Sequence, residues 1–206
     1  MVTGSISVRF EETKCTANIS MSNLPDDVSL IKRIAAQDDA AMRELHALYG
    51  QRMMAYALNL TQNGAMAEDV VQDSLIAVWR SAGRFRREGR VIAWLLGIVH
   101  HTAMKALRHP HQPLSEGMAE MLVAADPSPE EQVEVDERAA WVRRGLQSLS
   151  PNHRAALELV FYQGMSLADA ADVCGCPLGT IKSRLSYARR YLRDVLSSIP
   201  QVEDGR

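Results

Sequence analysis

Residues 165–193 read MSLADAADVCGCPLGTIKSRLSYARRYLR, and this segment carries the strongest structural signal in the chain. Ser166 and Asp169 have the spacing of a capping box, which predicts the start of a short helix. Gly175 predicts the end of that helix, and Pro177 suits the first turn of a second one. Two helices joined by a tight turn that contains glycine are typical of a helix-turn-helix unit.

The second helix of this unit is predicted to have an apolar side and a side rich in cations and hydroxyls. At about 100° per residue, a narrow stripe that must face the core is formed by Ile181, Leu185, Ala188 and Leu192. The other faces carry side chains able to hydrogen-bond base edges or phosphates, namely Thr180, Lys182, Ser183, Arg184, Ser186, Tyr187, Arg189, Arg190 and Arg193. The alternative is a solvated amphipathic helix whose basic residues serve only solubility.

Towards the N-terminus, further helical patterns occupy residues 24–109. The expected helices begin at about Pro25, Asp39, Met66 and Val91, and the last three end at about Leu60, Ser81 and Arg108. Breaks are predicted at Asn63-Gly64 and at Gly83, and a basic loop covers residues 84–90. The buried side of the second of these helices is expected to include Met42, Leu45, Leu48 and Tyr49.

These patterns predict an all-α protein of two helical domains. The chain has 206 residues, of which 47% are apolar and only 5% aromatic, a balance that favours helix over strand. The expected parts are a flexible leader (1–23), a first domain (24–109), a flexible acidic linker (110–130), a second domain (131–197) and a tail (198–206). Met21 is an alternative start of the chain.

The charge is distributed unevenly, although the formal net charge is only −2. Residues 24–110 hold 11 Lys and Arg against 9 acidic residues, and residues 139–194 hold 8 against 4. Between them, residues 111–138 hold a single Arg and 8 acidic residues. Two mildly basic blocks around an acidic connector indicate two modules that face nucleic acid.

Several other classes of protein are disfavoured. No apolar run approaches the roughly 20 residues needed to span a bilayer, and no signal peptide is apparent, so a cytoplasmic protein without membrane insertion is expected. No nucleophile–base pair or phosphate-binding glycine loop stands out, so neither enzymatic activity nor a cofactor is expected.

A metal site is not predicted either, although Cys174 and Cys176 form a Cys-x-Cys pair. The corner of a helix-turn-helix unit favours small buried residues, and zinc needs four converging ligands. The clustered histidines belong to the other block: His100, His101, His109 and His111. A sensor module that works through a metal or these thiols stays an alternative.

The run from Leu149 to Leu192 resembles region 4 of the extracytoplasmic-function sigma factors, in its L-S-P-x-x-R-x-A-L and P-L-G-T-I-K-S-R-L-x-x-A-R motifs. In that family this domain reads the upstream (minus-thirty-five) promoter element and packs on the flap of the polymerase beta subunit. By position, the resemblance assigns DNA contact to Thr180, Lys182, Ser183, Arg184, Ser186 and Tyr187. Many relatives carry a basic residue or His where Ser186 and Tyr187 stand, which implies a different base preference.

Residues 67–79 (AEDVVQDSLIAVW), Arg84-Phe85 and 93–96 (AWLL) are similar to region 2 of the same family. On the helix from Met66, five side chains point away from the predicted buried stripe: Asp69, Gln72, Asp73, Ile76 and Arg80. The resemblance implies that this face binds the clamp coiled coil of the polymerase beta-prime subunit. Without the resemblance, an ordinary surface that includes one Ile is the simpler interpretation.

The resemblance also implies that the loop and helix after Phe85 open the downstream (minus-ten) promoter element and capture a flipped base. The cationic and polar residues assigned to this task are Arg84, Arg86, Arg87, Arg90, His101, Lys105 and Arg108. Two positions depart from the family pattern: His101 stands in place of Asn, and Gly97 in place of a basic or polar residue. Trp94 is predicted to lie in the core rather than to stack on a base.

The resemblance therefore implies a sigma factor that binds core RNA polymerase and promoter DNA, directs transcription initiation, and is held by an anti-sigma factor until a stress or other signal releases it. The acidic linker then runs through polymerase channels or is a solvated tether. The main alternative is a stand-alone helix-turn-helix regulator, which predicts tight duplex binding without polymerase.

Overall fold

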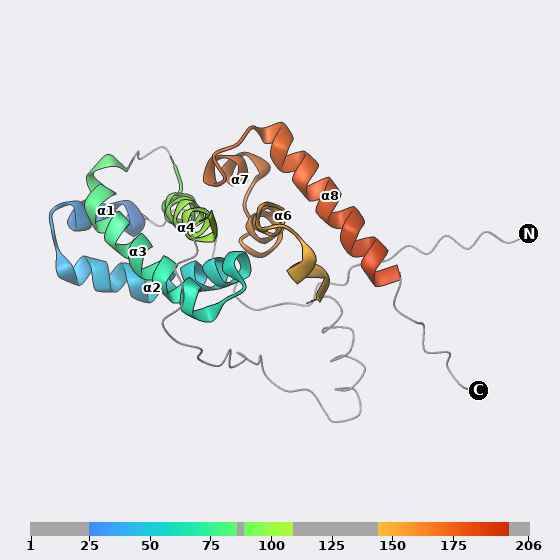
Figure 1. Cartoon of the computed structure of the whole chain (residues 1–206). Coiled ribbons are helices and arrows are strands. Elements are labelled where there is room, and N and C mark those ends of the chain that lie inside the picture. The colour runs from blue at the N-terminus through green and yellow to red at the C-terminus, as the bar shows by residue number, and fades with distance from the viewer. Residues whose placement is uncertain (1–24, 86–88, 109–143, 198–206) are drawn as a thin grey trace, which may run out of the picture.

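The structure is a computed structural model that describes residues 25–85, 89–108 and 144–197. Its elements are α1 (Pro25–Ala35), α2 (Asp39–Thr61), α3 (Gly64–Ser81), η1 (Ala82–Arg84), α4 (Val91–Arg108), α6 (Pro151–Leu157), η2 (Glu158–Tyr162), α7 (Leu167–Val173) and α8 (Leu178–Ser197). Residues 144–148 are also helical and precede α6. No strand occurs in these ranges, and the all-α prediction is confirmed (Figure 1).

Local capping signals set the helix ends in the N-terminal module, which comprises α1 to α4. The Asp38 carboxylate accepts hydrogen bonds from two backbone amides at the start of α2. Gln62, with a φ of 55°, ends this helix in the left-handed conformation. The side chain of Asn63 then accepts from the amide of Met66 at the start of α3. The predicted break at Asn63-Gly64 is confirmed, and α3 begins two residues before the predicted Met66.

A first core cluster joins α1 to its neighbours in the N-terminal module. Its buried members are Leu30, Ile31, Ile34, Ala41, Leu45, Val78, Ala82, Val91 and Leu95. Trp94 is half-buried against this cluster, so the prediction that it lies in the core is confirmed in part. The predicted burial of Leu48 is wrong, because its side chain is 55% exposed. The buried stripe of α2 runs through Leu45, Met53 and Tyr56, and Leu48 lies beside it.

The helix-turn-helix unit forms as predicted in the C-terminal module, residues 144–197. Ser166 and Asp169 make both hydrogen bonds of the capping box at the start of α7. At the other end, Gly175 has a φ of 58°, and the amide of Cys176 donates to the carbonyl of Ala171. This is a Schellman ending, which favours glycine at the left-handed position. On α8, the predicted stripe is buried at Ile181, Leu185 and Ala188 and half-buried at Leu192.

The two modules pack against each other, an arrangement that local sequence patterns do not predict. In Figure 1, α7 lies beside α4 and α6 beside α2, while α8 forms the outer edge of the C-terminal module. A second core cluster is continuous across this contact, with Met53, Leu60 and Val99 from one module and Ala155 and Leu159 from the other. The described part of the protein is therefore one packed body rather than two separate units.

Some predictions concern residues outside the described ranges. These are the leader (1–23), the acidic linker (110–130), the start of the second domain (131–143) and the tail (198–206). Arg86 and Arg87, assigned to the minus-ten element, also lie outside. Within the described ranges, no helix combines the length and apolar character required to cross a bilayer.

Candidate functional site

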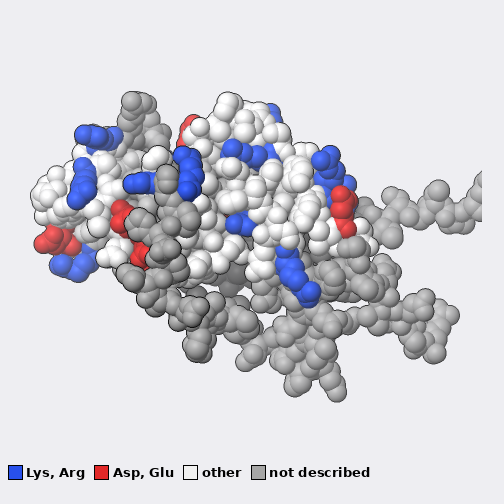
Figure 2. Space-filling view, viewed as in Figure 1, with Lys and Arg blue, Asp and Glu red and all other residues white. Residues whose placement is uncertain are grey.

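The outward face of α8 presents most of the side chains predicted to contact DNA. Lys182, Ser183, Ser186, Tyr187, Arg189 and Arg190 are exposed, and Thr180 and Arg184 are half-buried. The buried stripe on the opposite side fixes which face turns outward, because it anchors α8 on α6 and α7. Figure 2 shows Lys and Arg side chains on the α8 side of the molecule. The arrangement offers donors for base edges and cations for phosphates.

Aromatic contacts restrain the centre of this face. The ring of Tyr187 stacks on His153 of α6, with 4.4 Å between ring centroids and 24° between planes. The guanidinium of Arg190 lies 5.7 Å from the centre of the Tyr187 ring, and that of Arg189 lies 4.9 Å from the centre of Phe161. Burial, and secondarily the charge of Arg184, lower the pKa of His153. Helical periodicity identifies the side of α8 but gives no signal for these partners.

A second exposed face lies on α3, in the N-terminal module. All five side chains assigned to polymerase binding are exposed there: Asp69, Gln72, Asp73, Ile76 and Arg80. Their three- and four-residue spacing puts them on one side of the helix. Ile76 is 43% exposed, and the opposite side of α3 is buried through Val70, Ser74 and Val78. An exposed apolar side chain among acids and an amide is suited to protein docking.

The residues assigned to the minus-ten element divide between a cleft and the end of α4. Arg84, Arg90 and His101 line a cleft of about 870 Å³. Lys105 and Arg108 are exposed towards the end of α4 and do not line it.

Two aromatic rings lie in the same cleft and give it an apolar part. Phe85 and Trp94 both line it, with 5.2 Å between their ring centroids and 56° between their planes. The indole of Trp94 thus packs in the module and also faces the cleft. Rings beside cations can hold an unstacked base.

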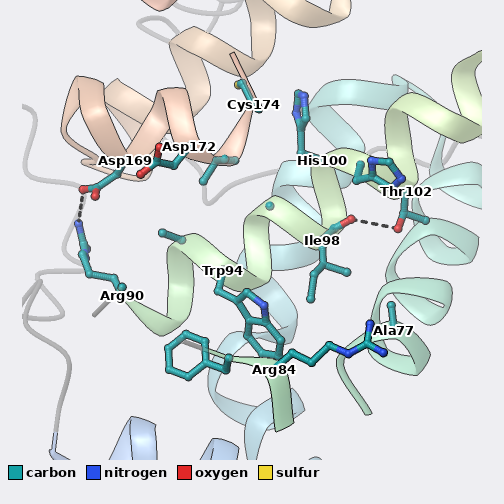
Figure 3. Close-up of a pocket in the computed structure, with 17 residues that line it drawn as sticks. Ala77, Arg84, Arg90, Trp94, Ile98, His100, Thr102, Asp169, Asp172 and Cys174 are labelled. Carbon is teal, nitrogen blue, oxygen red and sulfur yellow. Dashed lines mark hydrogen bonds and ion pairs between the residues drawn. The ribbon is translucent and has the colours of Figure 1, made fainter. Parts of the chain in front are cut away.

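The other side of the cleft belongs to the C-terminal module. Figure 3 shows Asp169 and Asp172 of α7 on one side and Arg90 and Trp94 on the other. The Arg90 guanidinium lies 3.5 Å from the Asp169 carboxylate, and both side chains are partly exposed. A residue expected to contact DNA is thus paired with an acid that caps a helix of the other module.

In the wall of the cleft, His100 is a buried residue that carries no predicted role in DNA binding. Its Nδ1 lies 2.9 Å from the hydroxyl oxygen of Tyr56 on α2. Burial lowers the pKa of His100 to about 4, with smaller contributions from Arg184 and His101. This histidine is therefore neutral at pH 7 and acts as a core hydrogen-bonding group.

The thiols of the Cys-x-Cys pair belong to the turn between α7 and α8. Burial raises the pKa of Cys174 to about 12, so this thiol is protonated and a poor nucleophile at pH 7. The guanidinium of Arg184 lies 3.7 Å from the Cys176 sulfur. Among the described residues, no group of three or more His, Cys, Asp or Glu could hold a metal ion.

Polar contacts between the modules include residues that sequence patterns did not single out. Arg154 of α6 donates to the carbonyl of Leu60 at 2.8 Å, and the amide of Asn59 donates to Glu158 at 2.7 Å. Arg52 donates to the side chain of Gln163 at 3.0 Å. Arg154 is the arginine of the L-S-P-x-x-R motif, but its partner on α2 cannot be read from the motif.

Two sequence families match this chain. Sigma-70 region 2 matches residues 45–111, and Sigma-70, region 4 matches residues 145–194. The first match covers most of the N-terminal module and the second covers most of the C-terminal module.

Relatives match over nearly their whole length. The chain is 32% identical over 168 residues to the ECF RNA polymerase sigma factor SigL of Mycobacterium tuberculosis, covering 80% of this chain and 94% of SigL. It is 29% identical over 183 residues to the RNA polymerase sigma-H factor of Pseudomonas aeruginosa, covering 84% of this chain and 95% of that protein.

Solved structures agree with these matches. The complex of the sigma factor RpoE with the anti-sigma factor NepR from Bartonella quintana contains a chain that is 30% identical, with a TM-score of 0.57 and coverage of 76% and 97% of the two chains. CnrH in complex with the cytosolic domain of CnrY gives a TM-score of 0.60 at 22% identity, over 84% of this chain and 98% of that one. The second likeness concerns the fold alone.

Proposed function

This chain belongs to the extracytoplasmic-function family of RNA polymerase sigma factors, and we propose that it binds core polymerase and directs it to a set of promoters. The observation that carries the proposal is the pair of exposed faces on different modules, one rich in cations and hydroxyls on α8 and one acidic with a central Ile on α3. A protein that joins promoter DNA to a large enzyme needs two such faces of different chemistry.

On this proposal, α8 enters the major groove of the upstream promoter element. Ser183, Ser186 and Arg190 face base edges, and Lys182 and Arg189 lie at the flank, where phosphates pass. A recognition helix that closes a helix-turn-helix unit commonly docks in this way. Base preference then depends on Ser186 and Tyr187, with Tyr187 held by His153.

The α3 face is proposed to dock on the clamp coiled coil of the beta-prime subunit, and the C-terminal module on the flap of the beta subunit. Ile76 supplies an apolar anchor, and Asp69 and Asp73 supply charges that steer a basic partner. The chain contributes binding and positioning, while polymerase contributes catalysis, so the protein has no enzymatic activity of its own. It acts in the cytoplasm, where polymerase is found.

The downstream promoter element is proposed to contact the cleft lined by Arg84, Arg90 and His101, together with Arg86, Arg87, Lys105 and Arg108. Cations attract the backbone of a single strand, and Phe85 and Trp94 offer apolar surface for a base. An anti-sigma factor is a further expected partner, since the similar Bartonella quintana sigma factor was solved in complex with one.

The test is in vitro transcription with core polymerase on a library of genomic fragments. The proposal expects defined start sites that depend on the added chain, preceded by shared upstream and downstream sequence elements. A gel-shift assay with and without core enzyme distinguishes a sigma factor from a stand-alone regulator, because only the regulator is expected to bind duplex DNA tightly by itself. The absence of any chain-dependent start site would refute the sigma-factor proposal.

A further inference from the structure

An aromatic contact between α6 and α8 lies at the centre of the face proposed to read DNA. The imidazole of His153, in the first turn of α6, stacks on the Tyr187 ring of α8 with 4.4 Å between ring centroids. The Ser150 hydroxyl lies 2.7 Å from the Nδ1 atom of His153, within hydrogen-bonding distance. Because Ser150 directly precedes α6, the start of that helix fixes the imidazole from its other side.

The backbone on both sides of this contact is anchored in the core. Next to His153, the buried Arg154 donates to the carbonyl of Leu149 at 2.7 Å. Next to Tyr187, Ala188 is fully buried, and α6 packs against α8 (Figure 1). The two rings therefore extend from helices that have little freedom to move apart.

The ring of Tyr187 is ordered on the surface although its side chain is still 44% exposed. The guanidinium of Arg190 lies over this ring, 5.7 Å from its centroid. The Tyr191 ring is almost parallel to it, at 10° and with 6.3 Å between centroids. Together with His153, these neighbours restrict the side-chain torsions of Tyr187. A ring that is ordered before binding loses less conformational entropy when it contacts DNA.

The chemistry of an ordered phenol favours one base in the major groove. Among the four bases, only thymine presents an apolar group there, its 5-methyl group. A phenol has a single hydroxyl, so it cannot form the paired hydrogen bonds by which a guanidinium selects guanine or an amide selects adenine. Its ring carbons, by contrast, are suited to contact with a methyl group. A ring held in one orientation can therefore select for that methyl group.

We propose that Tyr187 reads the methyl group of a thymine in the upstream promoter element, and that His153 is the positioning residue that orders the Tyr187 ring for this contact. This assignment rests on the proposed function and adds to it the base that one position of α8 selects.

The imidazole of His153 acts through Tyr187 and not as a cation. Burial, and secondarily the charge of Arg184, lower the pKa of His153, so the ring is neutral at pH 7 and offers no charge to a phosphate. Loss of His153 should therefore change base preference and leave the salt dependence of promoter binding unaltered.

The methyl contact is tested with holoenzyme made from the full-length chain and core polymerase. Promoters with a randomised upstream element are selected by transcription, and wild type should enrich thymine at one position. Deoxyuridine, which lacks only the 5-methyl group, then replaces that thymine in a selected promoter. The loss of one methyl contact should weaken holoenzyme binding about fourfold. Deoxyuridine at a thymine outside the upstream and downstream elements is the control and should leave binding unchanged.

Variants of the two rings separate the roles of the ring, the hydroxyl and the stack. Tyr187→Phe keeps the ring and should retain the thymine preference, whereas Tyr187→Ala should lose it. His153→Ala removes the stack and should reduce thymine enrichment at least about threefold. His153→Phe restores a stacking ring and should recover the enrichment. Tyr162→Ala is the matched control, because Tyr162 is an exposed tyrosine outside α8.

Circular dichroism and the salt slope of promoter binding distinguish positioning from a loss of structure. Both should be the same in His153→Ala as in wild type, while its preference for thymine over deoxyuridine falls. If wild type directs transcription but binds the thymine and deoxyuridine promoters equally, methyl reading is refuted and the sigma-factor function stands. If wild type and His153→Ala distinguish the two promoters equally well, the positioning role of His153 is refuted.

Discussion

The Arg90 guanidinium and the Asp169 carboxylate lie 3.5 Å apart, although 79 positions separate them in the sequence. Asp169 has a local task as well, because its carboxylate accepts from the Ser166 amide in the capping box of α7. One carboxylate thus stabilises a helix start in the C-terminal module and neutralises a cation of the N-terminal module. The pair joins a surface assigned to the minus-ten element to the helix that precedes the recognition helix.

Replacing the exposed Ile on α3 should impair polymerase binding. Ile76→Glu puts a charge at the centre of the proposed docking face and is expected to weaken binding to core polymerase at least about tenfold, or about 1.4 kcal/mol. Leu48→Glu is the matched control, because Leu48 is also exposed but lies on α2 outside that face. Binding is measured by fluorescence anisotropy of labelled protein, and equal losses in both variants would contradict the assignment.

Two cations on α8 should have different effects on promoter binding. Lys182→Ala removes a proposed phosphate contact and should weaken all promoters alike, with the salt slope of binding reduced by about 1. Arg190→Ala removes a proposed base contact and should cost about 1–3 kcal/mol at preferred promoters, with relaxed preference at one base pair. Both variants are assayed as holoenzymes on a promoter set at several salt concentrations. Identical profiles for the two would exclude this division of roles.

His100 should make stability depend on pH in mildly acidic solution. Its pKa is about 4 in the folded chain, below the ordinary value of 6.5, so the unfolded chain binds the proton more readily. The contribution of His100 to stability is complete above pH 6.5 and is lost as the pH falls towards 4. Between pH 7 and pH 5 the loss is about 2 kcal/mol.

The check is urea unfolding of wild type and His100→Gln at pH 7 and pH 5. The variant keeps a polar group near Tyr56 but cannot titrate, so its stability should fall less between the two pH values. Other titrating groups, such as Glu158, are common to both proteins and cancel in the comparison. An equal loss of stability in wild type and variant would show that His100 does not titrate in this way.

Glycine substitutions in the helix-turn-helix unit should differ by position. Gly175 has a φ of 58°, so Gly175→Ala is expected to cost about 1–2 kcal/mol of stability. Gly179→Ala is the control, because Gly179 lies in α8 and a Cβ there meets nothing within 4 Å. That change should be neutral or stabilising by up to about 1 kcal/mol. Thermal unfolding followed by circular dichroism measures both, and equal effects would contradict the role of the turn.

Much of the fold could be predicted because its signals are local. The capping box at Ser166 and Asp169, the turn at Gly175 and the stripe through Ile181 and Leu185 each depend on residues a few positions apart. Helical periodicity also correctly predicted that Ile76 faces outward on α3, although this prediction takes no account of the neighbouring helices. The prediction of burial was wrong at Leu48. Periodicity identifies the apolar side of a helix, but the packing of other helices determines which residues on that side are buried.

For several contacts in the candidate sites, the sequence predicted at most one of the two partners. The motifs selected Arg84, Arg90 and His101, but gave no sign of the acids on α7 that face them. They included Arg154 without its acceptor on α2, and they selected neither His100 nor its partner, the Tyr56 hydroxyl. Such partners are chosen by the packing of segments about 40 to 110 residues apart, for which no local spacing exists.

The sequence by itself determined two helical modules, the helix-turn-helix unit and the outward faces of α3 and α8, because helix ends and helix faces follow from neighbouring residues. Only the tertiary structure decided that α7 rests on α4 at Gly97, that one core cluster spans both modules, and that Asp169 meets Arg90. These contacts depend on how apolar surfaces from distant segments fill space together, which is a property of the packed chain and of no single segment.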